Sequence, residues 1–364
     1  MPKLNFTEAD WERIEGDTQA WWEGELKRPL VYLAVTDPLP RAMPHAYLTN
    51  YPLTMPAESV VDLYEPFICA THFYADAFPW WWMNFGPGIV AGFLGSKVGS
   101  VTDPSETVWF SPTQPTDIQN LHFTYDPENI WWKRVQSITA AAAERFGDML
   151  QVSHTDLGGN LDILASFRET QGLLFDVLEQ PEEVDRLVKE ITRLWLRYYD
   201  EQEVIIRKKC RGTSSWVPIW TTGKTYMLQC DFSYMISPAM FERFVMPDLV
   251  ACCNHLTHGF YHLDGKGEIP HLDMLLSIER LRGVQWIPGD GQPTPDQWLP
   301  LLKRIRDGGK LCQVSVSAEG ALRIVRNLGG KGFLLLISDY GGDFHEPEVV
   351  QAFLRKLKEE GISL

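Results

Sequence analysis

Short apolar runs alternate with amphipathic segments along the second half of the chain. Four of the runs have the length and composition of buried strands: residues 259–265, 284–291, 310–317 and 332–338. The segments after them place apolar residues three to four positions apart, which predicts helices over 271–282, 295–307, 318–328 and 346–360. Strands that alternate with helices in this way are typical of βαβ units and a parallel sheet.

The alternation extends toward the N-terminus. Strand-like runs occupy residues 28–35, 149–154, 214–220 and 226–230. Asp126-Pro127 and Ser237-Pro238 each combine an N-cap residue with proline at the first helical position, and a long amphipathic helix follows Pro181. About eight strand candidates result, the number that closes a (β/α)8 barrel. A doubly wound open sheet is the alternative, but no Gly-x-Gly-x-x-Gly follows any strand and opens a helix.

We therefore predict an α/β fold, a (β/α)8 TIM barrel that forms a single domain with an N-terminal helical extension. Residues 1–125 would supply the extension and the first barrel strand, packed on the barrel, and residues 126–364 the remainder. No internal repeat is evident that would indicate a solenoid.

Composition narrows the range of partners. The 364 residues are 45% hydrophobic and 22% charged, with a formal net charge of −15. Because nucleic-acid binding requires clustered cations, this acidity argues against a nucleic-acid partner. The N-terminus lacks the pattern of a signal peptide, no apolar stretch is long enough to span a membrane, and the six scattered cysteines are typical of reduced thiols. We expect a cytoplasmic protein without a membrane partner, and a homodimer stays open.

Polar residues follow five of the predicted strands. In a parallel barrel such residues converge on one mouth, because the carboxyl ends of the strands lie together. They are His154, Asp156, Asp231, His262, Asp264, Asp290, Ser338 and Asp339. An acid after a strand can instead cap the next helix, which is the alternative for Asp290 and Asp339. For Asp231 a functional role is favoured, since Ser237 already supplies the cap.

His262 and Asp264 alternate along one strand, so their side chains should share a face. Two ligands of one metal ion would have this arrangement, and so would a histidine oriented by a carboxylate for acid–base work. A purely structural pair is the third interpretation. The sequence leaves all three open.

The segment AFPWWWMNFGPG (77–88) contains Trp80, Trp81 and Trp82 in succession. Three consecutive side chains cannot all face one core, so at least one should be exposed or line a pocket. Tryptophan faces attract cations and stack on flat rings, which favours a methylammonium or aromatic ligand. A packed lid or an oligomer contact is the alternative.

Three segments resemble the uroporphyrinogen decarboxylase superfamily: CDFSYMISPAMFERFVMPDL (230–249), YHLDG (261–265) and GGKGFLLLIS (329–338). Members share an acid followed by S-P-x-x-F, a strand ending H-x-C-G and a last strand after a Gly-Gly-x-Gly-like turn. The block 156–188 is similar to the family's G-P…D…P-E-x-V block, and AWWEGELKRPLV resembles openings of divergent members. Together these segments cover roughly two-thirds of the chain and imply a TIM barrel with its active site at the carboxyl ends of the strands.

The resemblance implies one of two chemistries. Uroporphyrinogen decarboxylases carry an R-Q-A-G-R motif that binds the substrate's carboxylates, and nothing like it occurs here. Asp76 matches the position of their essential acid only loosely. Corrinoid-linked methyltransferases bind zinc through H-x-C and a later cysteine. Here Asp264 replaces the first cysteine, and Ser338-Asp339 stands where the second would be, which argues against a thiolate-rich site for activating coenzyme M.

Our hypothesis is a methyltransferase that moves a methyl group from a small methylated substrate, an aromatic methyl ether or a methylamine, to a corrinoid protein. Zinc would be held by His262 and Asp264, with Glu268 as a further ligand. The other expected catalytic residues are His154, Asp156, Asp231 and Asp76, and the expected substrate contacts are Trp80, Trp81, Trp82, Trp286, Asp290 and Arg168. The alternatives are a decarboxylase of a tetrapyrrole or other carboxylate, and a barrel that binds a small molecule without catalysis.

Overall fold

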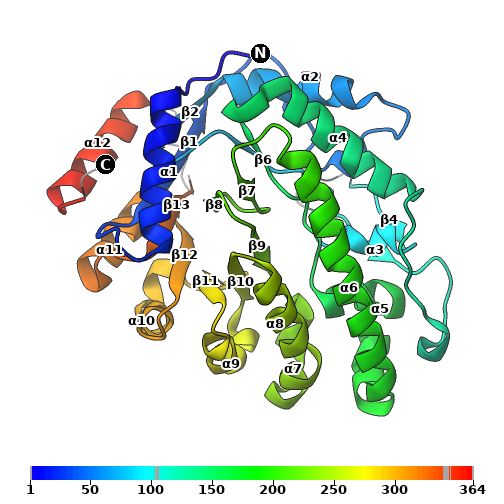
Figure 1. Cartoon of the computed structure of the whole chain (residues 1–364). Helices are drawn as coiled ribbons and strands as arrows, with labels where there is room; N and C mark the ends of the chain where they lie inside the picture. Colours follow the sequence, from blue (N-terminus) through cyan, green and yellow to red (C-terminus); the bar gives the residue numbers. More distant parts are fainter. Residues whose placement is uncertain (1, 102, 104–105, 339–343, 345, 363–364) are drawn as a thin grey trace.

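Helices and strands alternate through most of the computed structural model, which describes residues 2–101, 103, 106–338, 344 and 346–362 (Figure 1). The helices are α1 Glu8–Trp22, α2 Ala57–Cys69, α3 Val90–Phe93, α4 Ile130–Phe146, α5 Asn160–Glu179, α6 Pro181–Ile206, α7 Pro238–Phe244, α8 Met246–His255, α9 Leu272–Ser277, α10 Leu299–Asp307, α11 Ala318–Leu328 and α12 Pro347–Glu359. Short 3-10 turns lie at Leu48–Asn50, Ile118–Asn120, Gly147–Met149, Asp231–Met235, Lys266–His271 and Pro295–Gln297.

The strands are β1 Leu30–Thr36, β2 Thr71–Ala75, β3 Trp80–Trp81, β4 Lys97–Val98, β5 Phe110–Ser111, β6 Gln151–Val152, β7 Thr213–Ser214, β8 Trp220–Thr221, β9 Thr225–Leu228, β10 His258–Asp264, β11 Leu281–Ile287, β12 Leu311–Val316 and β13 Phe333–Ile337. Within the described residues, seven of them form one sheet in the order β2-β1-β13-β12-β11-β10-β9. Every neighbouring pair is parallel except β1 and β2.

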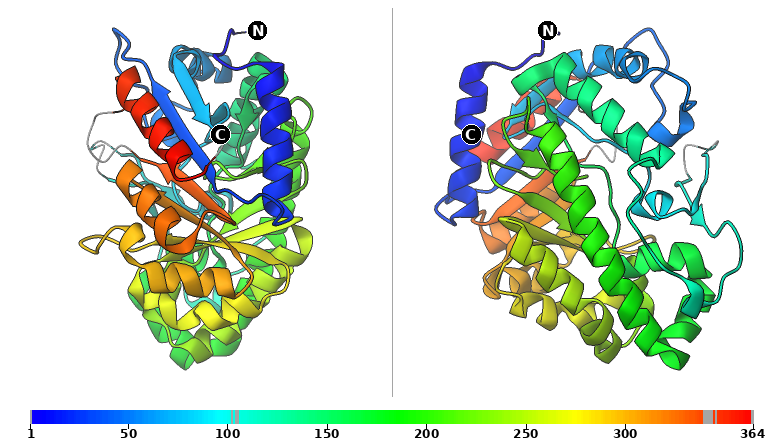
Figure 2. Two further views of the ribbon diagram at one scale, coloured as in Figure 1. Left: turned by 90° about the vertical axis from the view of Figure 1, so that its left-hand side faces the viewer. Right: turned by 45° about the vertical axis from the view of Figure 1, so that its right-hand side comes forward.

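The predicted α/β class with a parallel sheet is confirmed. Helices α6 to α12 lie outside the strands in chain order, as Figures 1 and 2 show. Among the described residues, however, the ladders do not form one continuous ring, because β3 pairs with β6 and β7 with β8 in separate two-stranded sheets. No described helix combines the length and apolar character needed to cross a bilayer.

Strand residues alternate between two apolar clusters. On β10, Tyr261 and Leu263 join the large cluster between sheet and helices, whereas Phe260 joins a second cluster with Leu30, Leu311 and Leu334. These residues lie at or near the amino ends of their strands. Because side chains alternate across a strand, the polar positions farther along β10 share the face of Phe260.

Helix α1 covers the amino ends of these strands. Trp21 and Trp22, at its C-terminal end, are 1% exposed and belong to the same cluster as Phe260. The Trp21 indole donates to the carbonyl of Phe333 at 3.1 Å, and the Trp22 indole to that of Trp220 at 2.9 Å. The interior is therefore covered at this end by Trp21 and Trp22.

Some elements differ from their predicted bounds. The helix expected over 271–282 is a 3-10 turn followed by α9, which ends at Ser277, and β11 already begins at Leu281. Pro270 lies inside the turn and cannot donate a helical hydrogen bond, so the regular helix starts only after it. The long run expected over 214–220 is two short strands, β7 and β8, joined by a tight reversal.

Candidate functional site

Strand β10 directs His262 and Asp264 toward the carboxyl end of the sheet interior. Both follow Phe260 at alternate positions, so they lie on the inner face, as the H-x-D spacing predicts. The neighbouring strand β9 ends at Leu228, and the chain then turns at Cys230 into the 3-10 turn that begins with Asp231. Asp231 therefore arrives beside the end of β10.

Asp231, His262 and Asp264 form the Asp-His-Asp cluster. One ligand atom from each lies within 4.8 Å of the others. His262 Nε2 is 3.9 Å from Asp264 Oδ2, and the side chains of these two residues are 14% and 38% exposed. Two carboxylate oxygens and one imidazole nitrogen suit zinc, and an ion bound to three protein ligands keeps a position for a substrate. The ligand atoms of a tetrahedral ion would be about 3.5 Å apart, so the side chains would need to close slightly.

Two buried residues hold the cluster in place. The Nδ1–H of His262 donates to Gln285 Oε1 on the neighbouring strand β11, which leaves Nε2 free to accept or to ligate. Glu268, fully buried, accepts a hydrogen bond of 3.2 Å from the backbone N–H of Asp264 through Oε2. Glu268 lies outside the cluster of three ligand atoms and supports Asp264 through its backbone.

Asp162 was not recognised in the sequence as a functional residue. It lies in the first turn of α5, and its carboxylate accepts the backbone N–H groups of Asp231 and Phe232 at 3.0 and 2.7 Å. The close approach requires Gly159, where a Cβ would lie 2.3 Å from the Gln229 carbonyl oxygen. The Gly158-Gly159 pair, three residues before Asp162, was the available sequence signal.

Carboxyl groups around the cluster are shifted toward the neutral form. Burial and the nearby charge of Asp231 raise the pKa of Asp162, while loss of hydration and the charge of Asp264 raise the pKa of Asp231. Burial lowers the pKa of His262, which favours the neutral imidazole required for ligation. Two carboxyls with raised pKa values in contact with a cavity can donate protons near neutral pH.

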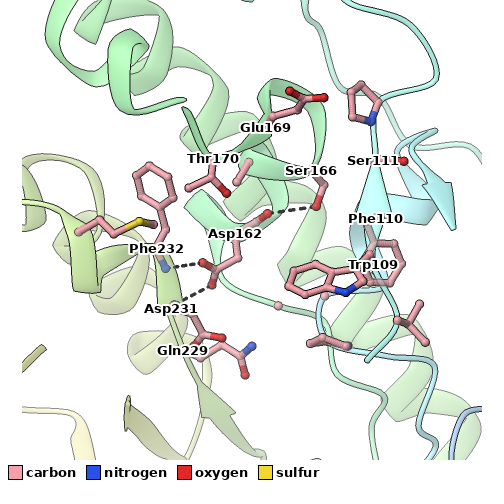
Figure 3. A pocket seen from close by; sticks show the side chains of 17 residues that line it. Trp109, Phe110, Ser111, Asp162, Ser166, Glu169, Thr170, Gln229, Asp231 and Phe232 are labelled. Atoms are coloured by element: carbon pink, nitrogen blue, oxygen red, sulfur yellow. Dashed lines mark hydrogen bonds between the residues drawn. The ribbon is translucent and has the colours of Figure 1, made fainter. Parts of the chain in front are cut away.

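A cavity of about 390 Å³ opens directly beside Asp231 (Figure 3). We call it the acidic cavity. Figure 3 shows α5 and the Asp231 turn facing Trp109 and Phe110 of the segment that ends in β5. It is lined by Pro87, Gly88, Val108, Trp109, Phe110, Ser111, Pro112, Gly158, Asp162, Ala165, Ser166, Glu169, Thr170, Gln229, Asp231, Phe232 and Met235. Its volume suits a small organic ligand.

The three consecutive tryptophans differ in burial, and they line a pocket, as expected for at least one of them. Trp81 is buried and packs on Tyr64 at 4.7 Å between ring centroids. Trp82 lies 6.4 Å from Trp216, whose ring is 5.1 Å from that of His262. All three tryptophans line a second cavity of about 650 Å³. Trp80 also donates to the Ser215 carbonyl at 3.3 Å.

His154 and Asp156 are deeply buried. The His154 ring stacks on Tyr199 of α6 at 4.2 Å and its Nδ1 pairs with the Ser214 carbonyl, and burial lowers its pKa to about 4. Asp156 accepts the N–H of Gly158, and burial, with a smaller contribution from Asp231, raises its pKa to about 8. Neither residue lines the acidic cavity.

Four other expected site residues lie away from the cluster. Asp76 is paired with Arg28 at 2.7 Å and accepts the N–H of Val31, at the amino end of the sheet. Arg168 pairs with Asp176. The fully buried Trp286 faces the helix layer and contacts Trp298, because its neighbour Gln285 faces inward. Asp290 is exposed on the loop after β11. Asp339 is outside the described residues, and Ser338 donates to the Val316 carbonyl through its backbone.

Comparisons with known proteins inform the fold. No family model matches the chain, and the search of curated proteins gives no match either. A solved methyltransferase from Methanosarcina mazei shares the fold, with a TM-score of 0.63 over 94% of this chain and 98% of that one. The sequences are 11% identical, so the likeness shows a common architecture, and the chemistry has to be argued from the site.

Proposed function

We propose that the chain is a methyltransferase of the uroporphyrinogen decarboxylase superfamily, which transfers a methyl group from a small methylated compound, an aromatic methyl ether or a methylamine, to a corrinoid protein. The observation that carries the proposal is the Asp-His-Asp cluster at the ends of β9 and β10, with one of its acids on the wall of the acidic cavity. The shared fold with a methyltransferase supports it.

The same proposal includes a closed barrel. Strand β13 pairs with β1, and the short strands continue the order on the other side through backbone hydrogen bonds. Ser153 donates to the Trp81 carbonyl at 3.1 Å, and His154 donates to the Ser214 carbonyl at 3.1 Å. These bonds join β3 to β6 and β6 to β7, and closure of the ring further requires that β3 lie beside β1 and β7 beside β9.

Zinc would be held by Asp231, His262 and Asp264, whose donor atoms suit it. When bound, zinc would supply a Lewis acid for the ether oxygen that carries the methyl group, whereas a protonated amine has no free electron pair and would leave without it. Gln285 keeps His262 Nε2 as the ligating atom, and Glu268 and Asp162 hold the backbone of the two aspartates. The cavity positions the substrate beside them.

An ether substrate needs a proton on its leaving oxygen, and a carboxyl group at the cavity wall can provide it. When the methyl carbon passes to the acceptor, the electron pair of the broken carbon–oxygen bond stays on oxygen. Asp162 at the cavity wall, whose pKa is raised to about 7, is placed to protonate that oxygen, whereas Asp231 would be ionised as a zinc ligand. Decarboxylation is less well supported, because it requires cations to hold carboxylates and no lysine or arginine is among the cavity's described lining residues.

Elemental analysis of the purified chain tests the metal. We expect about one zinc per chain in the wild type, lost in both His262→Ala and Asp264→Ala, because each variant removes one of three ligands. His122→Ala, whose side chain is 66% exposed and far from the cluster in sequence, is the matched control and should keep the metal. A wild type purified without chelators that holds no metal would overturn the zinc assignment.

Methyl release tests the reaction. Methoxyaromatic compounds and methylamines, each with cobalt(I) cobalamin as acceptor, should give methylcobalamin with the wild type and none with His262→Ala. Equal rates for the two proteins would show that the cluster has no part in methyl transfer.

A further inference from the structure

The lining of the acidic cavity has a consistent charge. Its ionisable lining residues are Asp162, Glu169 and Asp231, and the described lining contains no lysine, arginine or histidine. In Figure 3 Glu169 lies above Asp162 and Asp231 lies below it, so the carboxyls are spread along the cavity wall rather than gathered at one point. A bound cation gains Coulomb energy from the carboxyls that are ionised and in turn favours their ionised form, whereas the described lining offers no cation to attract an anion.

Aromatic surface faces the same space. Trp109 and Phe110 lie on one side in Figure 3 and Phe232 on the other. Trp109 is 74% exposed, an unusual state for the largest apolar side chain. A ring face of this kind attracts organic cations, and a ligand held against Trp109 would remove apolar surface from water.

An unpaired acceptor adds an independent indication of a ligand. Gln229 lines the cavity and is 6% exposed, yet its Oε1 has no hydrogen-bond partner. Because a buried acceptor without a donor is unfavourable, a ligand N–H would relieve it. Both carboxylate oxygens of Asp162 already accept backbone N–H groups, which leaves Gln229, Asp231 and Glu169 to receive a donor.

Glu169 is held at the wall by a costly backbone conformation. Its φ of 58° and ψ of 157° interrupt α5, in a region that side-chain-bearing residues rarely occupy. Such a conformation costs on the order of 1–3 kcal/mol and persists mainly at functional sites. Here it places a carboxylate on the cavity wall.

We infer that the acidic cavity binds a protonated, N-methylated organic amine, with its methyl groups against Trp109 and Phe232 and its N–H directed at Gln229 Oε1. The inference rests on the proposed function and selects a methylamine class of substrate over an aryl ether. The reaction balances without a proton donor. The carbon–nitrogen bond breaks, its electron pair stays on nitrogen, the amine leaves neutral, and the nucleophilic acceptor supplies the electron pair of the new bond to carbon.

Three probes separate charge from shape. Dimethylethanolamine is a protonated amine with an N–H, 3-methyl-1-butanol is its neutral carbon isostere, and choline is a cation without an N–H. In calorimetric titrations of the purified protein at neutral pH, we expect dimethylethanolamine to bind about tenfold more tightly than the neutral isostere, with choline between them. Equal affinity of the amine and the alcohol, or no binding of the amine, would overturn the inference.

Variants locate the site. Trp109→Ala and Glu169→Gln should each weaken binding of dimethylethanolamine by about threefold or more, because each removes an attraction for the cation. Gln229→Leu should remove the preference for dimethylethanolamine over choline. Glu182→Gln, whose side chain is 80% exposed outside the cavity, is the matched control. Unchanged affinity in both Trp109→Ala and Glu169→Gln would place the amine elsewhere and overturn the inference.

These titrations do not require turnover, so the two proposals can fail separately. Tight, Trp109-dependent amine binding without methyl transfer would overturn the proposed function and leave the inference intact. Methyl transfer from methoxyaromatics without amine binding would support the proposed function and overturn the inference.

Discussion

Individual side chains in the site depend on buried partners that never contact a substrate. Gln285 is the clearest case, because its amide oxygen accepts the Nδ1–H of His262 and so selects the tautomer with a free Nε2. Gln313 occupies the paired position on the next strand, but its two amide atoms have no partner. Of these two paired glutamines, only Gln285 forms a hydrogen bond with His262.

We predict that Gln285→Leu lowers zinc affinity by about 10- to 100-fold, because loss of such an orienting partner typically has this effect on a ligating histidine. Competition with a chromophoric chelator measures the change. Gln313→Leu removes a similar side chain from the same layer and should leave the affinity unchanged. Equal losses in the two variants would mean that packing, and not the bond to His262, is responsible.

His154 predicts an acid sensitivity. Its pKa in the folded chain, about 4, lies below the value of 6.5 expected when unfolded. Between these values the unfolded chain binds the proton and the folded chain does not, so stability falls as pH drops from about 6.5 to 4. In His154→Gln this part of the loss, about 2–3 kcal/mol, should disappear from urea unfolding curves. His122→Gln, exposed, should retain the wild-type slope.

Among the elements, those from β10 onward could be predicted from the sequence because parallel strands are buried on both faces and give continuous apolar runs. The run Leu311–Val316 and the helix Ala318–Leu328 follow this rule. Strand β2 was missed, because its five residues are all only partly buried and pair antiparallel with β1. Helix α5 was also missed, since Gly158-Gly159 precedes it and Glu169 interrupts it.

The residues of the candidate site likewise fall into those that the sequence could place and those that it could not. His262 and Asp264 could be found because alternation along one strand fixes their common face. Asp162 could not be placed, since its partners Asp231 and Phe232 are about seventy residues away in sequence. For Trp286 the local pattern gave no orientation, and the register of β11 directs it into the helix layer.

Strands β10 and β11 approach each other closely at Gly283. A Cβ there would lie 2.1 Å from ring atoms of Phe260, inside the cluster beneath His262. We predict that Gly283→Ala destabilises the fold by about 1–3 kcal/mol through overpacking. Gly16→Ala, in helix α1 with open space at the Cβ position, should be neutral or stabilising.

The variant Phe260→Leu tests whether the ring of Phe260 causes the destabilisation expected in Gly283→Ala. If the clash with the ring is responsible, the double variant with Gly283→Ala should lose less stability than the sum of the single variants in chemical denaturation. Additive losses would show that the ring is not what limits the space at residue 283.

The molecule as a whole has one closed and one open end. Helix α1 seals the amino ends of the strands with Trp21 and Trp22, and the Asp-His-Asp cluster lies at the carboxyl ends between the acidic cavity and Trp216. The packed residues at the closed end can therefore stabilise the fold. The open end can contain exposed Trp109 and buried polar groups, which would destabilise a hydrophobic core.

Trp22→Ala tests this division. The Trp22 side chain is 1% exposed, stacks on His258 at 4.3 Å and donates to the Trp220 carbonyl, so its removal should cost about 3–5 kcal/mol. Trp109→Ala, at the open end and 74% exposed, should change the free energy of unfolding by less than about 0.5 kcal/mol. Urea denaturation followed by circular dichroism compares the two. Because Trp22 has no ring contact or hydrogen bond with Asp231, His262 or Asp264, the folded fraction of Trp22→Ala should retain its zinc. Similar stability losses in both variants would mean that α1 does not close the interior, and that the fold draws its stability from the helix layer alone.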